Sequence, residues 1–384
     1  MKKLLYLSNL RLPTEKAYGI QIAEMCSAFA GIGLEVLLAY PYRKNPHRDF
    51  FNYYGIKKNF KIKVIPAVDF YLSGSLDKIS VVVKSFISAL FLAFYGLFSG
   101  ADFIYSRDEW PIYFLSFFKN NLIFEAHRFS PKRKSFYNRF KKKGVRVVVI
   151  SEAIKKDFVK FGFPVSILVA HDGVDMDLFD VDIPKEEARS KTNLPKDQKI
   201  IMYAGHLFDW KGADVLLEVA RNFEFRISDF EKKGGILFVF VGGTEYDLKQ
   251  FKKKAEGLSN TLILGQKPHK EMPLFLKAAD ILVLPNSASN KISSYTSPLK
   301  LFEYMASGRP IVASNLESIG EILNQNNAIL VKPDDNLDLS NGIIKALEHQ
   351  DICNQISAKG LEDVKNYTWQ KRAERIGAYL GLSF

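Results

Sequence analysis

Residues 297–308 (SPLKLFEYMASG) combine backbone and side-chain groups that suit a phosphorylated ligand. The opening serine is a preferred N-cap and the proline a preferred first helical residue, so we expect a helix that begins at Pro298. The free amides of Leu299 and Lys300, together with the helix dipole, can receive a phosphate oxygen. Glu303 follows one turn later, where its carboxylate can accept hydrogen bonds from paired ribose hydroxyls. By spacing alone, the segment fits a capped packing helix equally well.

A second candidate phosphate site follows the apolar run 200–204, which is typical of a buried strand. Gly205 and His206 come directly after this run, and Lys211 stands just before the next helix-length segment. A cation beside a closely approaching backbone suits a diphosphate, whereas a surface lysine without a ligand is the simpler alternative. Gly243 ends the run FVFVGG, where it permits either a tight turn or close packing against a ligand.

The N-terminal half contains candidates of the same kind. His127 ends the run NLIFEAH, and a histidine at the carboxyl end of a strand has access to the edge where ligands bind. Arg107 in FIYSRD occupies a similar edge and is a candidate for contact with an acceptor or a phosphate. Glu125 either orients its neighbours or acts in the site, and Gly19 permits close approach beside the loop after the first run.

These residues belong to a regular alternation of short apolar runs and helix-length segments, which predicts an α/β fold with parallel sheets. A length of 384 residues favours two domains. At 181–198 the alternation lapses into polar sequence with two prolines, so we predict a linker there, with Rossmann-like domains at 1–180 and 199–366. The runs expected as strands are 3–10, 35–41, 63–67, 102–107, 121–127, 145–151 and 166–174, then 199–207, 235–243, 261–266, 280–286, 310–314 and 328–333.

The net charge of +12 is concentrated in the first half of the chain. Residues 1–180 hold 27 Lys and Arg against 16 Asp and Glu, a net charge of +11, and KRKSFYNRFKKK (132–143) is the most basic run. This asymmetry fits attraction to anionic phospholipids, to a lipid diphosphate or to a nucleic acid, although a solvated helix face explains the run equally well. We therefore expect an anionic membrane surface as a partner.

Other features of the sequence indicate a cytoplasmic protein. Only Cys26 and Cys353 are present, which is too few for a disulfide framework and fits a reducing compartment. The N-terminal apolar run is broken by polar residues and lacks a cleavage site, so we interpret it as a strand and not as a signal peptide. The apolar stretch 79–98 contains Lys84 and several serines, and we predict a buried helix there rather than a membrane span.

The segment SPLKLFEYMASGRPIVAS resembles the donor-binding signature of the retaining, GT-B-fold glycosyltransferases of family 4 type (glycosyl transferases group 1). The resemblance extends over almost the whole chain, through EAH, HDGVD, YAGHLFDWKGADVLL, FVGG, ILGQKP and AADILVLP in the same order. It implies two Rossmann-like domains that face each other across a cleft, the first binding the acceptor and the second the nucleotide sugar. It also implies that residues 367–384 form a helix that returns to the N-terminal domain.

The resemblance assigns roles to individual residues. Glu303 matches the glutamate that binds the nucleotide's ribose, while Tyr295 stands where the family usually has a second glutamate that contacts the donor sugar. Lys211 matches the second member of a basic pair that neutralises the leaving diphosphate, and His206 falls near the first. His127 matches a histidine placed against the donor sugar. The remaining donor-binding candidates are Gly19, Gly205, Gly243, Gly265, Lys267, Ser297, Leu299 and Lys300, of which Gly265 and Lys267 lie in the loop that faces the base.

We therefore expect a hexosyltransferase that acts with retention on a nucleoside diphosphate sugar, with UDP-sugars favoured and GDP-mannose next. The expected acceptor is a glycan or lipid-linked molecule in surface polysaccharide or glycolipid synthesis, at the inner face of the plasma membrane. We expect no cofactor and no catalytic metal. Asp175/Asp177 and Asp180/Asp182 have the Asp-x-Asp form that binds a divalent metal in another class of glycosyltransferase, but here they match the family's Gly-Val-Asp segment and have no third carboxylate placed nearby. The alternatives are a GT-B-fold UDP-sugar epimerase and a basic nucleic-acid-binding protein, although the basic run forms no known RNA motif.

Overall fold

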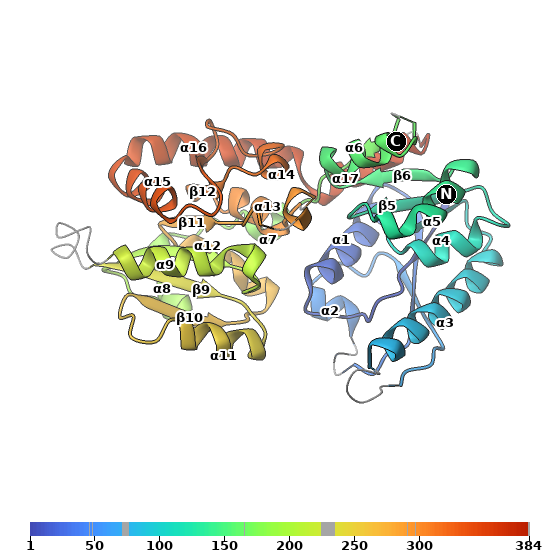
Figure 1. The fold of residues 1–384 in the computed structure, drawn as a ribbon, viewed down its shortest axis with the longest axis horizontal. Coiled ribbons are helices and arrows are strands. Elements are labelled where there is room, and N and C mark those ends of the chain that lie inside the picture. The colour runs from blue at the N-terminus through green and yellow to red at the C-terminus, as the bar shows by residue number, and fades with distance from the viewer. Residues whose placement is uncertain are drawn as a thin grey trace. The chain divides into compact units, whose positions relative to one another are not determined.

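The computed structural model describes residues 1–45, 47, 49–70, 77–164, 166–223, 235–289, 291–295 and 297–382. The chain divides into two compact units, and Figure 1 shows both. The first unit contains Met1–His171 together with Trp369–Phe384, and the second contains Asp172–Thr368. Ser383 and Phe384, which end the predicted terminal segment, lie outside the described residues.

The first unit is built on a seven-stranded sheet in the order β3-β2-β1-β4-β5-β6-β7, with every neighbouring pair parallel. The β1/β4 neighbours mark the point where the strand order reverses, because each later strand is added on the other side of β1. The strands are β1 (Lys3–Leu7), β2 (Glu35–Pro41), β3 (Lys61–Ile65), β4 (Phe103–Ser106), β5 (Leu122–Ala126), β6 (Arg146–Val149) and β7 (Leu168–Val169).

Helices connect these strands, as a parallel sheet requires. They are α1 (Ala17–Gly31), α2 (Phe50–Tyr54), α3 (Asp77–Leu97), α4 (Glu109–Leu115), α5 (Lys134–Lys142) and α6 (Glu152–Lys160), with the C-terminal α17 (Trp369–Tyr379). Helix α17 packs against α1, so both ends of the chain belong to this unit (Figure 1).

The second unit contains a six-stranded parallel sheet in the order β10-β9-β8-β11-β12-β13. Its strands are β8 (Lys199–Ala204), β9 (Ile236–Val241), β10 (Thr261–Gly265), β11 (Ile281–Leu284), β12 (Ile311–Ser314) and β13 (Ile329–Val331). Its α-helices are α7 (Met176–Phe179), α8 (Lys185–Thr192), α9 (Ala213–Phe223), α11 (Glu245–Lys254), α12 (Met272–Ala278), α13 (Leu299–Ala306), α14 (Glu317–Gly320), α15 (Asn336–Glu348) and α16 (Gln350–Asp363).

Both faces of this second sheet are buried, which explains why its strands are continuously apolar. Alternate residues of β8 point to opposite sides: Ile200 and Met202 belong to one core cluster, whereas Ile201 and Tyr203 belong to the other. The order of the strands reverses between β8 and β11. In open sheets of this kind, ligands bind beyond the carboxyl ends of the strands at this switch point.

The predicted linker at 181–198 is wrong, because this stretch folds as part of the second unit. Helix α8 lies within it and packs against α12. Arg189 of α8 donates from Nη2 to Asp280 Oδ2 at 2.5 Å and from Nε to the Ala278 carbonyl at 3.0 Å. The division between the units therefore falls at 171/172 and not at 180.

Residues 79–98 were predicted as a buried helix; the helix is present, but the prediction that it is buried is wrong. The segment forms α3, which by length and composition is apolar enough to cross a membrane, but only 39% of its most apolar 18-residue window is buried. Its buried residues are mostly small or polar: Ser80, Lys84, Ser88, Ala89, Leu92, Ala93 and Gly96. Several of its largest apolar side chains are exposed.

Candidate functional site

Glycines stand at the carboxyl ends of three neighbouring strands of the second sheet, at positions 205, 242 and 265. Gly205 N donates to the Val241 carbonyl at 2.8 Å, and Gly242 N donates to the Gly265 carbonyl at 2.7 Å, so the ladder continues past the ends of β8 and β9. Gly205 and Gly242 have φ angles of +146° and +121°, which L side chains rarely adopt. A Cβ on Gly242 would also collide with the Gly205 carbonyl. The glycines at this edge therefore meet conformational and packing requirements of the protein itself.

Two lysine side chains lie at this edge. Lys300 comes from α13, and a Cβ built on Gly205 would lie 3.3 Å from its Nζ. Its Nζ is also 3.8 Å from the centroid of the Tyr203 ring, a cation–π contact. Lys211 ends the short 3-10 helix η3 (Asp209–Lys211), and its Nζ lies 4.0 Å from the centroid of the Trp210 ring. Both ammonium groups thus rest on aromatic rings at the β8/β11 switch point.

Burial lowers the pKa of both lysines, and for Lys300 the charge of Lys211 lowers it further. Burial lowers the pKa of Lys211 to about 8. The pKa of Lys300 is held well below its ordinary value by burial and then by the charge of Lys211, against a smaller opposing effect from Glu303. Lys300 is only 8% exposed, and its Nζ has no hydrogen-bond partner among the described residues. A buried cation without an acceptor is costly, so this arrangement suits a bound anion.

Helix α13 has the predicted position but begins one residue later than expected. It spans Leu299–Ala306 with Pro298 as its N-cap, and no side chain caps it. Ser297 is not the cap; its Oγ accepts a hydrogen bond from Asp172 N at 3.1 Å. The first amides of the helix, those of Leu299 and Lys300, have no acceptor within the helix itself.

Glu303 has a partner that the sequence analysis missed. His269 Nε2 lies 3.0 Å from Glu303 Oε1, and the His269 ring packs 5.3 Å from the Phe179 ring. His269 lies in the 3-10 helix η4 (His269–Glu271) after β10 and therefore orients the carboxylate that we expect to bind ribose. Tyr295, at the position of the family's other glutamate, is 5% exposed.

The other donor-binding candidates of this unit occupy the same edge. His206 stacks on Phe208 at 5.0 Å, and its carbonyl accepts a hydrogen bond from the Tyr203 hydroxyl at 2.5 Å. Gly243 has φ +89°, and a Cβ there would press on Leu207, which gives it a packing role. Lys267 follows β10, and its Nζ lies 5.6 Å from the Phe275 ring.

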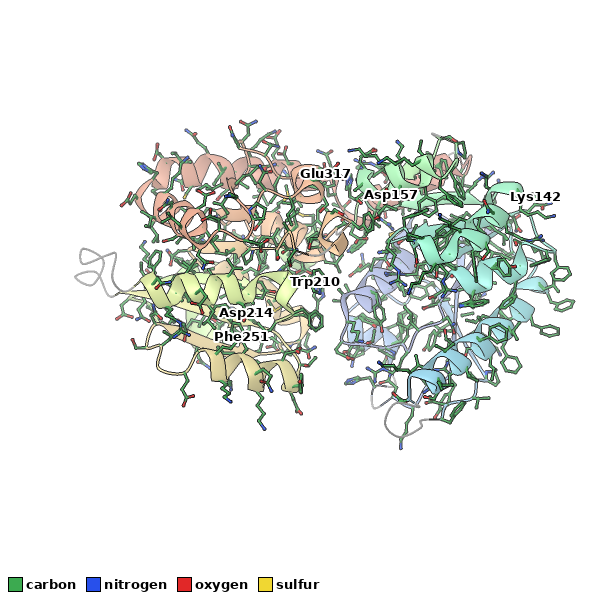
Figure 2. All side chains as sticks on the ribbon, in the orientation of Figure 1. Lys142, Asp157, Trp210, Asp214, Phe251 and Glu317 are labelled. Atoms are coloured by element: carbon green, nitrogen blue, oxygen red, sulfur yellow. The ribbon has the colours of Figure 1, made fainter. Side chains whose placement is uncertain are left out.

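A buried side-chain amide at this switch point was also missed by the sequence analysis. Asn286 follows β11 and is fully buried, and neither of its side-chain polar atoms has a partner among the described residues. The backbone beside it contacts the Lys211 loop, because Ser287 N donates to the Trp210 carbonyl at 3.1 Å. Figure 2 shows Trp210 near the start of α9.

In the first unit, Glu125 is the centre of a buried polar network. Its Oε1 accepts from Gln21 Nε2 at 2.6 Å and lies 2.5 Å from His127 Nε2, while Oε2 pairs with Arg372 Nη2 at 3.1 Å and accepts from the Tyr105 hydroxyl. Burial alone would raise the pKa of Glu125, but Arg372 and the hydrogen bond from His127 hold that pKa well below its ordinary value. Glu125 is fully enclosed, and all of these partners belong to the protein itself. Arg372, on α17, was not predicted.

The other candidates of the first unit lie beside its β1/β4 switch point. Arg107 follows β4 and donates from Nη1 to Gln21 Oε1 at 2.7 Å, which links it to the Glu125 network. The pKa of Asp108 is raised by burial to about 6, although its carboxylate accepts a hydrogen bond from Asn9 N at 2.6 Å. Gly19 lies in α1, and the space for a Cβ is filled by Tyr54 and Thr14. Its lack of a side chain therefore serves packing within the protein.

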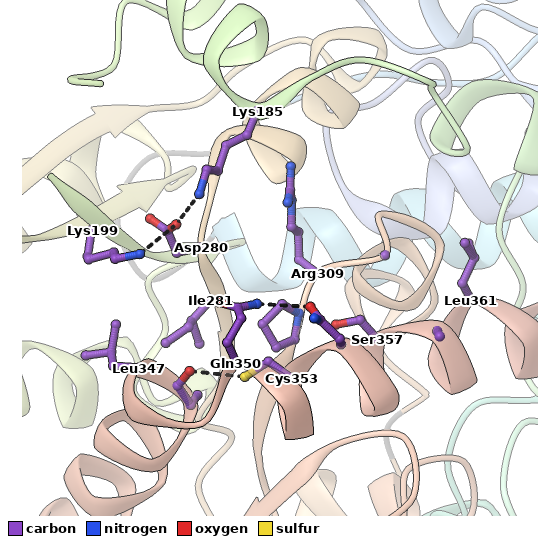
Figure 3. A pocket seen from close by; sticks show the side chains of 15 residues that line it. Lys185, Lys199, Asp280, Ile281, Arg309, Leu347, Gln350, Cys353, Ser357 and Leu361 are labelled. Carbon is purple, nitrogen blue, oxygen red and sulfur yellow. Dashed lines mark hydrogen bonds and ion pairs between the residues drawn. The ribbon is translucent and has the colours of Figure 1, made fainter. Parts of the chain in front are cut away.

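A pocket on the second unit lies at the opposite, amino edge of its sheet, because Asp280 and Pro310 precede β11 and β12 (Figure 3). Lys185 Nζ lies 2.6 Å and Lys199 Nζ 3.9 Å from Asp280 Oδ1. The ion pairs that Lys185 and Arg189 make with Asp280 fasten α8 to the sheet, so these charged side chains of the pocket have a structural role.

The acidic pair considered as a metal site also has a local structural role. The Asp175 carboxylate accepts a hydrogen bond from Asp177 N at 3.0 Å and thereby caps α7.

Comparison with known proteins identifies the relationship. Residues 184–363 match the family described as Glycosyl transferases group 1. The chain is 24% identical over 221 residues to D-inositol 3-phosphate glycosyltransferase 1 of Catenulispora acidiphila, covering 56% of this chain and 51% of that protein. It is 25% identical over 208 residues to the putative teichuronic acid biosynthesis glycosyltransferase TuaC of Bacillus subtilis, covering 54% and 47%. The chain thus spans about half the length of these curated relatives.

The whole chain is similar to a solved structure. Anabaena Alr3699/HepE in complex with UDP and glucose superposes with a TM-score of 0.73, covering 100% of both chains at 15% sequence identity. Together with the two parallel α/β sheets, this likeness establishes the GT-B fold, as predicted. The match of residues 184–363 to the glycosyl transferases group 1 family agrees with the resemblance stated from the motifs.

Proposed function

We propose that this protein is a retaining hexosyltransferase that uses a nucleoside diphosphate sugar, with UDP-sugars favoured and GDP-mannose next. The family match of residues 184–363 supports transferase activity, and the UDP in the Alr3699/HepE complex supports the choice of base. The observation that carries the proposal is the pair Lys211 and Lys300 at the β8/β11 switch point. Two adjacent cations at the edge of a Rossmann-like sheet suit a diphosphate.

In this proposal, the two lysines stabilise the charge that develops on the departing nucleoside diphosphate, which is electrostatic preorganisation at the leaving group. The ammonium of Lys300 takes the place of the first cation of the family's basic pair, since position 206 is a histidine. The first amides of α13 add donors for a phosphate oxygen. Glu303, oriented by His269, binds the ribose hydroxyls. The lysines carry the charge role that a metal fills in other transferases, so we propose a metal-independent reaction.

The first unit is proposed to serve the transferred sugar and the acceptor. His127, held by Glu125, would position the sugar and not act as a base. Arg107 would contact the acceptor or a phosphate. The basic N-terminal half and the name of the TuaC relative support a glycan or lipid-linked acceptor in surface polysaccharide or glycolipid synthesis. We propose a cytoplasmic protein bound to the inner face of the plasma membrane.

Thermal-shift measurements with UDP, GDP and ADP test the nucleotide site, because a ligand that binds the native state raises its melting temperature. UDP should give the largest shift, and at about one hundred times its Kd it should add about 2.7 kcal/mol of stability. Lys211→Met and Glu303→Gln should each reduce that shift. If UDP raised the melting temperature of both variants by as much as that of the parent chain, the proposed nucleotide site would be wrong.

A second assay separates transfer from the alternative functions. Release of UDP from UDP-sugars should require an acceptor, whereas an epimerase would convert the sugar without releasing UDP. A nucleic-acid-binding protein would shift its melting temperature with oligonucleotides and not with UDP.

A further inference from the structure

Helix α3 in the first unit has its polarity reversed relative to an ordinary surface helix. A surface helix turns its apolar stripe inward and its polar side outward. Along α3 and the residue after it, Lys78 is the only exposed charged side chain, and the other exposed large side chains are apolar. Among them are Val82, Phe86, Leu90, Phe94 and Phe98, which recur every four residues and so form one ridge. Val82, Phe94 and Phe98 are 67%, 65% and 71% exposed.

The inward side of α3 is tied to the rest of the unit by polar contacts. Lys84 Nζ lies 3.6 Å from Asp69 Oδ1 in a buried ion pair. Arg43 Nη2 donates to Ser88 Oγ at 2.6 Å, and Asn9 Nδ2 donates to Ser85 Oγ at 3.0 Å. A helix that crossed a bilayer would expose these groups to lipid, at high cost. The helix therefore stays on the unit, and only its outer side is available to an apolar partner.

The exposed surface continues from α3 over α4 to a basic fringe on α5. Phe86 of α3 packs 5.2 Å from the Trp110 ring of α4, and Phe118, just after α4, is 71% exposed. The Arg139 guanidinium of α5 lies 3.4 Å from the centroid of the Phe117 ring. Figure 2 shows aromatic side chains projecting outward along α3, with Lys142 at the same outer edge of the unit.

We propose that this surface, the α3 face, docks onto an anionic lipid bilayer. A contiguous apolar surface of this kind marks an interaction site, and aromatic and aliphatic side chains beside a fringe of lysines match the interface of an anionic membrane. Asp77 is the only acidic residue between 77 and 98, so little opposes anionic head groups. A second copy of the chain fits less well, because a symmetric dimer would bring two strongly basic surfaces together.

In this arrangement α3 lies in the plane of the membrane. The ridge enters the boundary between head groups and acyl chains to a depth of about 5–10 Å, and the lysines of α5 contact lipid phosphates. The binding has an apolar part that salt does not screen, in addition to the electrostatic part that the basic sequence alone predicts. It requires no nucleotide, so its test is independent of the proposed transferase activity.

Flotation of the full-length protein with vesicles tests the α3 face. Binding should occur on vesicles with about 30% phosphatidylglycerol, and part of it should persist at about 1 M NaCl, where charges are screened beyond about 3 Å. The double variant Phe94→Ser, Phe98→Ser should lose about tenfold or more of the bound fraction. Tyr246→Ser is the matched control, since Tyr246 is 75% exposed on α11 of the other unit, and it should bind as the parent does.

A fluorescence measurement locates the contact. Both native cysteines are buried, so a cysteine introduced at the surface can be labelled selectively with an environment-sensitive dye. Labelled Phe94→Cys should shift its emission to the blue when vesicles are added, whereas labelled Tyr246→Cys should not. The proposal is overturned if the parent chain does not float, if the double variant floats equally well, or if the label at 94 shifts only because the protein self-associates. Light scattering on the labelled protein without vesicles detects that last case.

Discussion

Replacing Lys300 with methionine separates a ligand-binding lysine from one that stabilises the fold. Its Nζ is buried at the switch point, rests on the Tyr203 ring and has no hydrogen-bond acceptor among the described residues. Methionine has similar length and an apolar stem, so it should preserve the packing while removing the charge. If the ammonium group serves to bind phosphate, its removal should raise the free energy of unfolding of the ligand-free protein and lower its affinity for UDP.

The expected magnitudes follow from the burial. An unsatisfied buried polar group costs about 1–3 kcal/mol, and for a unit of this size 1 kcal/mol corresponds to about 2–4 °C. The melting temperature of Lys300→Met should therefore rise by roughly 2 to 12 °C. A hydrogen bond to a charged group contributes about 1.5–3 kcal/mol, so the Kd for UDP should rise about 10- to 100-fold.

The pH dependence provides a further check. Burial lowers the pKa of Lys300 in the folded chain, so the unfolded chain binds this proton more tightly. The stability of the parent chain should therefore rise with pH between the lowered pKa and the ordinary value of about 10.4, and the variant should lose this contribution.

Calorimetric unfolding and isothermal titration with UDP measure both effects on one preparation. Lys252→Met is the matched control, because Lys252 is exposed on α11 of the same unit, and both quantities should stay within about 0.5 kcal/mol of the parent. A variant that melts below the parent, or that binds UDP as tightly, would refute the assignment of Lys300 to a phosphate site.

Three further predictions concern the other residues of the two units. Burial lowers the pKa of Lys211 to about 8, so the binding of UDP should take up protons near pH 8–9, and its affinity should fall by up to about tenfold per pH unit above 8. Calorimetric titrations in two buffers of different ionisation enthalpy measure this proton uptake. Equal binding heats in both buffers would contradict the prediction. His269→Ala removes the contact that orients Glu303, so the ratio of the affinities for UDP and 2′-deoxy-UDP should fall by about 3- to 10-fold. An unchanged ratio would show that His269 has no role in ribose binding. Glu125→Gln leaves buried Arg372 without its anion and should lower the free energy of unfolding by about 3–5 kcal/mol. The stability that the low pKa of Glu125 contributes is present above about pH 4.3 and lost as the pH falls, so the stability of the variant should depend less steeply on pH in acid. An acid-unfolding curve like that of the parent chain would show that Glu125 does not stabilise the unit through its charge.

The sheets were predictable because their central strands, such as β4, β5 and β11, are buried along their whole length and so stand out as apolar runs. Residues 35–41, for example, were predicted as a strand and form β2 with the same bounds. The start of α13 was displaced by one residue because the Ser297 hydroxyl, predicted as a cap, is used by Asp172 instead. The linker prediction failed because α8 is polar in sequence yet is held by Arg189 through Asp280, a contact 91 residues away along the chain.

Candidate residues within a local motif could be named from the sequence. Lys211 and Glu303 were named in this way and stay predictions, whereas Lys300 was named for its backbone amide and not for its ammonium group. His269 and Arg372 were missed because their roles depend on contacts with Glu303 and Glu125, which are distant in sequence. For α3, composition predicted a helix correctly, but mean hydropathy does not tell which side of the helix faces the protein.

The position of the diphosphate in a crystal structure of the protein with UDP tests the central claim most directly. The account predicts phosphate oxygens within hydrogen-bonding distance of Lys211 Nζ and Lys300 Nζ, beside Gly205 and at the amino end of α13, with the ribose at Glu303. Occupancy of the pocket around Asp280 and Arg309 at the opposite edge of the sheet, with Lys300 still without an acceptor, would contradict it.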